Sequence, residues 1–105
     1  MISQDIIGTP IKIENIEIAQ YDFPEKMTWE EALNACIKLG DGWRLPTKKE
    51  LNFIYKSKEL ITDNIFSQFW CSLDQNDDFA WYIFFGNGKW TNCQKNVKCD
   101  VRAVK

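Results

Sequence analysis

The side chains best suited to chemistry in this sequence are thiols, because the chain has four cysteines and no histidine. Histidine is the residue that most often serves as a general base, and it is the commonest ligand of transition metals. A cysteine buried on an apolar face without such a neighbour usually behaves as a small hydrophobic residue. The sequence therefore predicts no catalytic residue, no metal site and no cofactor.

The redox state of these cysteines depends on the compartment, because an oxidising one would allow two disulfides and the cytosol would keep thiols. The first eight residues show no basic region followed by an apolar run. We therefore expect no standard export signal and a cytoplasmic or phage-associated protein. In that setting all four cysteines, Cys36, Cys71, Cys93 and Cys99, should be thiols. If a signal had been removed, Cys93 and Cys99 would be the expected pair, on opposite sides of a short loop.

The best candidate for a binding surface is the turn and strand around Trp90. An aromatic ring among amide and ammonium groups can stack on a sugar or anchor a protein contact while the polar groups fix orientation. The alternative is a tryptophan folded inward beneath an ordinary polar loop, and strand alternation does not decide between the two. The candidate ligand-binding residues are Asn87, Lys89, Trp90, Asn92, Gln94, Lys95 and Asn96.

A second polar stretch carries Asp74, Asp77 and Asp78. These carboxylates could supply oxygen ligands to calcium, but the stretch lacks the glycine and the final bidentate glutamate of an EF-hand loop. We interpret it as an exposed acidic loop.

Length and composition limit the remaining classes of function. A chain of 105 residues, 45% hydrophobic and 27% charged, fits one globular domain over residues 1–105. The net charge is −2, and lysines are interspersed with acidic residues, so nucleic acid is a poor candidate partner. No stretch approaches the roughly 18 apolar residues of a membrane span, so membrane insertion is not expected.

Two short helices are predicted, each starting at a capping box. Thr28 and Glu31 form the first box, and Thr47 and Glu50, directly after a proline, form the second. The first helix should bury the face of Trp29, Leu33, Cys36 and Ile37 and end at Gly40. The second should bury Leu51, Ile54 and Tyr55 and leave Lys48, Lys49, Asn52 and Lys56 in water.

The rest of the chain favours strands. Residues 11–18 indicate a short hairpin or one bent strand, and residues 61–68 indicate a loop. Strands are expected at 69–73 and 79–85, and the Gly86-Asn87-Gly88 turn joins the latter to the next strand in a hairpin. A half-buried last strand is expected over residues 99–104. One strand region, two helices and several late strands indicate an α+β domain with a small, mostly antiparallel sheet.

Three ordered stretches resemble a known bacterial family. They are Gly42-Trp43-Arg44-Leu45-Pro46-Thr47 with Glu50-Leu51, then Phe69-Trp70-Cys71-Ser72 with Ala80-Trp81, and finally Val101-Arg102-Ala103-Val104. In this order they are similar to the motifs of the family typified by the C-terminal domain of collagen-like adhesins, over residues 27–105. Two positions depart from its pattern: Cys71 stands where the family usually has serine, and Ala103 where it usually has cysteine, which puts a family disulfide at the last strand in doubt.

The resemblance implies a C-type-lectin-like fold with paired terminal strands and two helices on one side of a small sheet, whose exposed face and loops bind a partner. Related folds display carbohydrate, glycosaminoglycan or protein binding sites. The tripeptides of the calcium-dependent sugar site are absent, and Trp90-Thr91-Asn92 is only a faint counterpart of one of them.

Within the motifs, structural roles are favoured over binding roles. Trp43 is expected to fill the core between the helices, and Arg44 to hold loop carbonyls or a carboxylate. Trp70 and Trp81 are expected in the core. The full set of residues predicted to be structural is Trp43, Arg44, Pro46, Trp70, Trp81 and Arg102.

Three functions remain open at this point. The leading hypothesis is a non-catalytic recognition domain that binds a protein or glycan through the C-terminal sheet and loops. A second is a structural or assembly subunit of a phage or surface complex, for which a homo-oligomer is one form, since the strand at 11–18 could offer an unpaired edge. A third is a thiol-dependent enzyme of the formylglycine-generating type. Such chemistry needs a reactive thiol pair or a copper site, and this short chain lacks the insertions and the histidine- or cysteine-bearing geometry for one; adjacent exposed cysteines with a lowered pKa would favour it.

Overall fold

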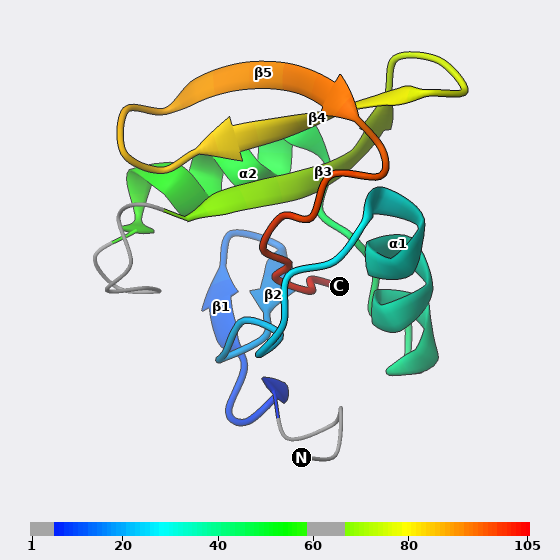
Figure 1. Ribbon diagram of the computed structural model, residues 1–105. Coiled ribbons are helices and arrows are strands. Elements are labelled where there is room, and N and C mark those ends of the chain that lie inside the picture. Colours follow the sequence, from blue (N-terminus) through cyan, green and yellow to red (C-terminus); the bar gives the residue numbers. More distant parts are fainter. Residues whose placement is uncertain (1–5, 59–66) are drawn as a thin grey trace.

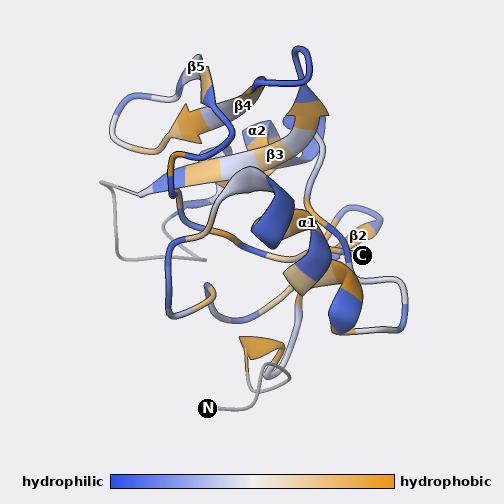
Figure 2. Ribbon diagram, turned by 45° about the vertical axis from the view of Figure 1, so that its right-hand side comes forward, coloured by the Kyte–Doolittle hydropathy of each residue, from blue (hydrophilic) through white to orange (hydrophobic). Residues whose placement is uncertain are grey.

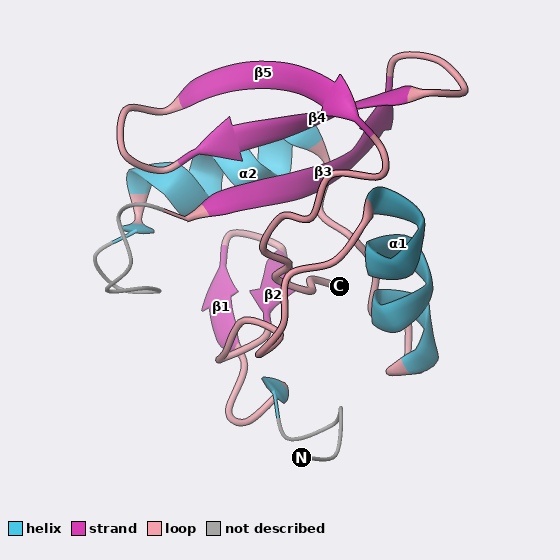
Figure 3. Ribbon diagram, in the orientation of Figure 1, coloured by secondary structure: helices cyan, strands magenta, loops and turns pink. Residues whose placement is uncertain are grey.

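A computed structural model describes residues 6–58 and 67–105 of the chain. The described elements comprise a β-hairpin, two helices and a three-stranded sheet, in that order along the chain (Figures 1 and 3). The loop predicted at residues 61–68 lies mostly outside the described residues, and Gln68 already belongs to a strand. None of the helices in the described part of the chain is long and apolar enough to cross a membrane.

The N-terminal hairpin consists of β1 (Ile11–Ile13) and β2 (Ile16–Ile18), paired antiparallel. Glu14 takes a positive φ of 56° in the tight turn between them. The outer side of β2 pairs with the end of the chain, because Glu17 and Lys105 exchange backbone hydrogen bonds of 2.7 and 2.9 Å. The predicted pairing of the terminal segments is therefore present, and the C-terminus lies beside β2 (Figure 1).

Both helices begin at the predicted capping boxes. The first, α1 (Trp29–Lys38), has Thr28 as its N-cap, and the second, α2 (Lys48–Lys56), has Thr47. In each, the threonine hydroxyl accepts from the N3 amide while the N3 glutamate accepts from the threonine amide. Local sequence alone determines these starts.

The buried face of α1 differs from the predicted one. Trp29, Ala32 and Cys36 are buried, but Ile37 is 62% exposed. Hydrophobic and hydrophilic stretches both occur along the helix (Figure 2). Because Ile37 follows Cys36 by a rotation of about 100°, it lies at the border of the buried stripe and faces solvent.

The main sheet is antiparallel and has the order β3-β4-β5, formed by β3 (Gln68–Asp74), β4 (Phe79–Phe84) and β5 (Lys89–Gln94). The predicted turn joins β4 to β5, and Gly88 has the positive φ of 73° that such a turn requires. Figures 1 and 3 show α2 running along one face of this sheet.

The sheet separates two cores, because successive side chains of a strand point to opposite faces. On one side, Trp70 and Ala80 pack with Trp29 and the other buried residues of α1; we call this the α1 core. On the other side, Ile83 packs with the buried residues of α2, and we call this the α2 core. The two helices therefore pack on opposite faces of the main sheet, not on one side as the resemblance implied.

The C-terminal segment, residues 99–104, corrects one prediction. It forms isolated bridges to Met27, Phe69, Arg44 and Ile18 rather than a continuous strand. Five of its six residues are buried, and only Asp100 is partly exposed, so it is not half-buried. The reason is its position between the hairpin and the main sheet, where both of its sides are covered.

Candidate functional site

Two tryptophans of the main sheet hold a lysine of α2 between them. The Nζ atom of Lys48 lies 4.6 Å from the ring centroid of Trp81 and 5.0 Å from that of Trp90. These distances are within the range of cation–π attraction. We call the three residues the tryptophan–lysine cluster. Lys48 is the first residue of α2, where the helix dipole disfavours a positive charge, so the two rings supply the favourable surroundings for its ammonium group.

The cluster lies at the border between core and solvent. Trp81 and Trp90 are both half-buried against the α2 core, so Trp81 is not the core residue that the sequence predicted. The indole N–H of Trp90 donates to Asn52 Oδ1 at 3.1 Å. Trp90 is therefore neither fully exposed nor folded beneath the loop.

A row of polar side chains continues from the cluster along β5. Trp90 pairs with Ile83, Asn92 with Trp81, and Gln94 with Phe79, and alternate residues of a strand share one face. The Asn92 amide donates to Gln75 Oε1. This face of β5 therefore presents, in order, the indole of Trp90, the amide of Asn92 bonded to Gln75, and the exposed amide of Gln94.

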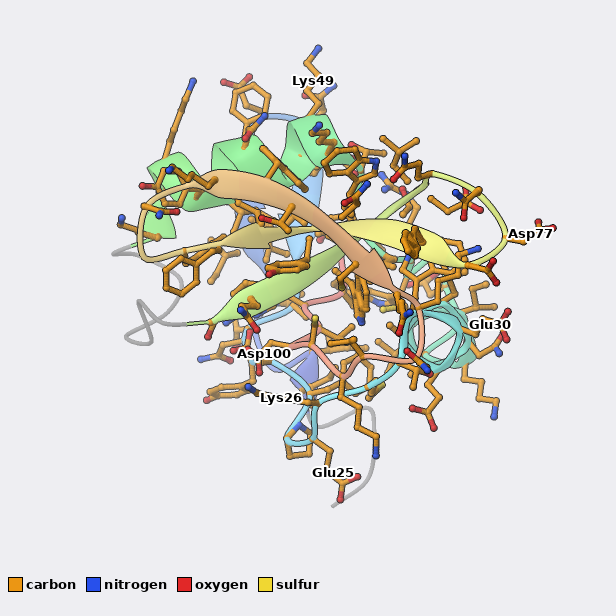
Figure 4. All side chains as sticks on the ribbon, turned by 45° about the horizontal axis from the view of Figure 1, so that its top comes forward. Glu25, Lys26, Glu30, Lys49, Asp77 and Asp100 are labelled. Atoms are coloured by element: carbon orange, nitrogen blue, oxygen red, sulfur yellow. The ribbon has the colours of Figure 1, made fainter. Side chains whose placement is uncertain are left out.

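The row ends at a surface groove of about 630 Å³ at the far end of β5. The groove lies between the start of α1, the β3–β4 loop and the loop after β5. Its acidic side chains include Glu30 and Asp77, which lie on the same side of the molecule (Figure 4). We call it the loop groove; its lining residues are Thr28, Glu30, Asp77, Asp78, Phe79, Gln94, Lys95 and Asn96.

Lys95 of the loop groove is held by both its side chain and its backbone. Its Nζ atom forms an ion pair of 3.1 Å with Asp74 and lies 4.5 Å from the ring centroid of Trp29. Its backbone is also held, since Lys95 N donates to Asp78 O and Trp29 N donates to Lys95 O. The loop after β5 is therefore tied to both the β3–β4 loop and α1.

The acidic β3–β4 loop is organised by an asparagine. Asn76 Oδ1 accepts hydrogen bonds from the amides of Asp78 and Phe79, at 2.8 and 2.9 Å. Asp74, Asp77 and Asp78 are all exposed. Within residues 6–58 and 67–105, no three carboxylate or thiol groups come together in a way that could hold a metal ion.

The seven predicted ligand-binding residues fall into three places. Asn87 and Lys89 lie at the β4–β5 turn, where Asn87 Oδ1 accepts from Lys89 N at 2.9 Å. Trp90 and Asn92 belong to the row on β5. Gln94, at the end of that row, and the two residues after it line the loop groove.

The sequence did not point to the partners of the row from other elements. Lys48 and Asn52 were assigned to a solvated helix face, yet they contact Trp90, and Gln75 contacts Asn92. Their positions depend on how α2 and the β3–β4 loop meet the sheet. The pattern of neighbouring residues in the sequence does not indicate how these elements meet.

Several residues predicted to be structural lie in the interior. Trp43, Pro46 and Trp70 are buried, and Trp70 Nε1 donates to Met27 O at 2.8 Å. Arg44 forms two hydrogen bonds with the Glu50 carboxylate, at 2.6 and 2.7 Å. This contact, together with the capping interaction with Thr47, lowers the pKa of Glu50 to about 2.

Arg102 forms a buried ion pair in the C-terminal segment. Its Nε donates to Asp22 at 2.5 Å and its Nη1 to Ala19 O at 3.0 Å. Burial raises the pKa of Asp22 and outweighs the opposite effect of the guanidinium. The pair thus joins the end of the chain to the segment that follows the hairpin.

The four cysteines are thiols in the structure. Burial raises the pKa of Cys36 and of Cys99 to about 12, and it also raises the pKa of Cys71 and of Cys93. A catalytic thiol needs the opposite shift, because the thiolate is the nucleophile.

Comparison with known families identifies one match. A family model described as the Lcl C-terminal domain matches residues 12–105. The match begins within β1, so it includes the hairpin that the motif resemblance, starting at residue 27, left out. No curated protein matches the chain.

Several solved structures have the same fold. The snake venom toxin convulxin gives a TM-score of 0.72 at 17% identity over 93% of this chain and 95% of that one. EMS16, an antagonist of the collagen receptor integrin α2β1, gives 0.71 at 11% identity over 93% and 96%. Botrocetin gives 0.68 at 16% identity over 93% and 96%. These are C-type-lectin-like proteins, and at such identities the likeness shows the fold.

Proposed function

Because the chain belongs to the Lcl C-terminal domain family and has the C-type-lectin-like fold, we propose that it is a non-catalytic recognition domain. Its ligand is a protein or glycan, bound through the main sheet and the loops at its end. The observation that carries this proposal is the tryptophan–lysine cluster, in which two half-buried indoles meet solvent beside a row of amides.

The chemistry of this surface suits recognition. An indole face can stack on the C–H groups of a sugar or on an apolar side chain of a protein. Asn92 and Gln94 offer both donors and acceptors, which can fix the orientation of the bound group. The row leads into the loop groove, so one ligand could contact the rings and the groove together.

Relatives of the fold support recognition of proteins as one use of such a surface. Botrocetin has been solved in complex with the von Willebrand factor A1 domain, and EMS16 acts against an integrin. A binding screen against both classes of ligand decides whether this chain recognises a protein or a glycan.

The state of the thiols supports a non-catalytic role. A thiol-dependent reaction would need a cysteine with a lowered pKa, whereas all four thiols have raised values. The chain also has no histidine to serve as a base.

A paired binding screen tests the proposal. The wild-type domain and the Trp90→Ala variant are applied to a glycan array and, in parallel, to immobilised candidate partner proteins. Lys49→Ala is the matched control, because Lys49 lies beside Lys48 in the chain and its side chain points away from the molecule (Figure 4). We expect Lys49→Ala to retain every ligand of the wild type and Trp90→Ala to lose them. Equal binding by all three proteins would refute the proposed surface.

A second candidate function is that of an assembly subunit, and one observation favours it. Ile37 is 62% exposed beside an apolar groove of about 250 Å³ that also involves Leu33 and Leu45. This groove lies between α1, the 44–47 segment and β3, and its lining includes neither tryptophan of the tryptophan–lysine cluster. Light scattering would decide: an oligomer that becomes monomeric in Ile37→Ser supports assembly through this groove, and a monomeric wild type contradicts it.

A further inference from the structure

Two of the four thiols are neighbours in the structure although neither takes part in the proposed binding surface. Cys93 lies near the end of β5, and Cys99 lies where the chain returns to pair with Met27. Cys99 is fully buried in the α1 core, and Cys93 is half-buried against the same core. The two thiols are close enough for each to affect the pKa of the other.

We propose that Cys93 and Cys99 are a site of reversible oxidation, and that a disulfide bond between them closes the loop of residues 94–98. The bond itself follows from the two thiols and needs no ligand. Its effect on recognition rests on the proposed function, because Gln94, Lys95 and Asn96 of this loop line the loop groove.

The backbone on both sides of the pair already holds the two cysteines in place. Met27 and Cys99 exchange two hydrogen bonds of 2.9 Å, and Cys93 pairs with Ala80 in the sheet. Within the loop, Val97 N donates to Gln94 O at 3.0 Å. Because both cysteines lie against the α1 core and the backbone beside each is fixed, we expect the bond to form at the narrow separation that disulfides require without a rearrangement of the fold.

The reaction is a thiol–disulfide exchange with a small-molecule disulfide such as glutathione disulfide. The Cys93 thiolate attacks one sulfur of the oxidant, forms a mixed disulfide and releases one glutathione thiolate. Cys99 then loses its proton and attacks the Cys93 sulfur, which releases the second glutathione. The protein loses two protons and two electrons, and the oxidant is reduced to two thiols.

Cys93 is the cysteine expected to react first. It is the more exposed of the two, and although burial raises its pKa, the Cys99 side chain acts in the opposite direction. Cys99 is held protonated: its own burial, the neighbouring Cys93 and Asp100 raise its pKa to about 12, and Lys26 opposes this only weakly. Since both thiols must ionise in turn, the oxidation should be slow at pH 7 and faster at pH 9.

The other two cysteines provide internal controls. Cys36 is buried in the α1 core and Cys71 in the α2 core. Burial is the main cause of the raised pKa of each, and no cysteine is among the neighbours that affect either group. They should remain thiols under conditions that oxidise the pair.

The experiment is a mass-spectrometric map of the oxidised domain. The reduced full chain is incubated with glutathione disulfide, alkylated with N-ethylmaleimide under unfolding conditions, and digested with trypsin, which cuts after Lys95 and Lys98. We expect the two peptides that contain Cys93 and Cys99 to be joined, with Cys36 and Cys71 alkylated. A bond between either of these and another cysteine, or four alkylated cysteines after prolonged oxidation, would overturn the proposal.

Single variants separate an adjacent reactive pair from an ordinary exposed thiol. In Cys99→Ser, the resolving thiol is missing, so the mixed disulfide at Cys93 should accumulate. In Cys93→Ser, Cys99 should take up glutathione far more slowly than Cys93 does. If the wild type also stops at the Cys93 mixed disulfide, the pair does not close and the proposal is wrong.

Hydrogen exchange then measures the effect on the loop, again without a ligand. The amides of residues 94–98 should exchange several-fold more slowly in the oxidised protein, while those of α2 stay unchanged. A binding screen that finds no ligand would refute the proposed function but leave this result intact. If the disulfide is confirmed but the exchange of these amides is unchanged, the bond does not rigidify the loop that lines the loop groove, and that part of the proposal is wrong.

Discussion

Two pairs of tryptophans in this domain differ in what their indole groups contact. Trp29 and Trp70 are buried in the α1 core, and their N–H groups donate to the backbone carbonyls of Cys71 and Met27, both at 2.8 Å. Trp81 and Trp90 are half-buried, and the N–H of Trp90 donates to the side chain of Asn52.

The difference separates scaffold from surface. A buried indole N–H must be paired, and a backbone carbonyl provides a partner that moves only if the fold moves. A side-chain partner such as Asn52, or a neighbour such as Lys48, can change rotamer without disturbing the sheet. A ligand could therefore replace the contacts of the second pair but not those of the first.

The largest expected effect is that of Trp70→Ala. Removing a fully buried indole leaves a cavity and removes one of the two hydrogen bonds to Met27 O, and we expect it to lower the free energy of unfolding by about 3–5 kcal/mol. Urea denaturation followed by circular dichroism measures the change. A loss below about 1 kcal/mol would mean that Trp70 is not part of the scaffold, and the contrast between the two pairs would fail.

The next effect concerns the Arg44–Glu50 ion pair, which holds α2 and its residues Lys48 and Asn52 against the rest of the domain. Glu50→Gln weakens the bidentate contact with Arg44, and we expect a loss of about 1.5–3 kcal/mol at pH 7. Urea denaturation measures this loss.

The same contact predicts how stability depends on pH. The Glu50 pKa is about 2 in the folded protein and 4.5 as its ordinary value. The contribution is thus complete above pH 4.5 and is lost as the pH falls through about 2. Denaturation midpoints measured between pH 7 and pH 2 should fall less steeply in Glu50→Gln than in the wild type. If the midpoints of the two proteins fall in parallel, the Arg44–Glu50 contact does not contribute to the pH dependence of stability.

Trp90→Ala should cost less than Trp70→Ala. We expect a loss of about 1–2 kcal/mol, an ordinary value for a partly buried side chain, with the near-UV circular dichroism of the remaining tryptophans retained. Thermal melts and spectra check this. A variant as unstable as Trp70→Ala would assign Trp90 to the scaffold, and the proposed surface would have to be placed elsewhere.

The smallest effect on stability is expected for Lys48→Met. The cation–π contacts are worth about 0.5–1 kcal/mol, and removal of a positive charge from the start of α2 returns a comparable amount. Stability should therefore change little, whereas the tryptophan fluorescence should change because both rings lose their cation. Lys49→Met, the matched control, should leave the emission as it is. Identical spectra for the wild type and both variants would remove Lys48 from the cluster.

The features that the sequence predicted well are set by neighbouring residues. The starts of both helices follow from Thr28 with Glu31 and from Thr47 with Glu50, and the β4–β5 turn follows from Gly86-Asn87-Gly88. Each depends on backbone conformations within a few positions, so spacing is sufficient to find it.

The features that the sequence missed depend on contacts between distant elements. Alternation places Trp81 and Trp90 on one face of the sheet, but not how far α2 covers that face, so Trp81 was assigned to the core. The C-terminal segment is buried because the hairpin and the sheet enclose it. Lys48 was assigned to water because the two rings that hold it come from strands more than 30 positions away in the chain.

The most direct test of the recognition surface is hydroxyl-radical footprinting of the domain with and without a ligand found in the binding screen. We expect Trp81 and Trp90 to become protected when the ligand is bound, while the exposed Ile37 and Leu73 react as before. Protection of Ile37 and Leu73 with unchanged reactivity of the two tryptophans would contradict it.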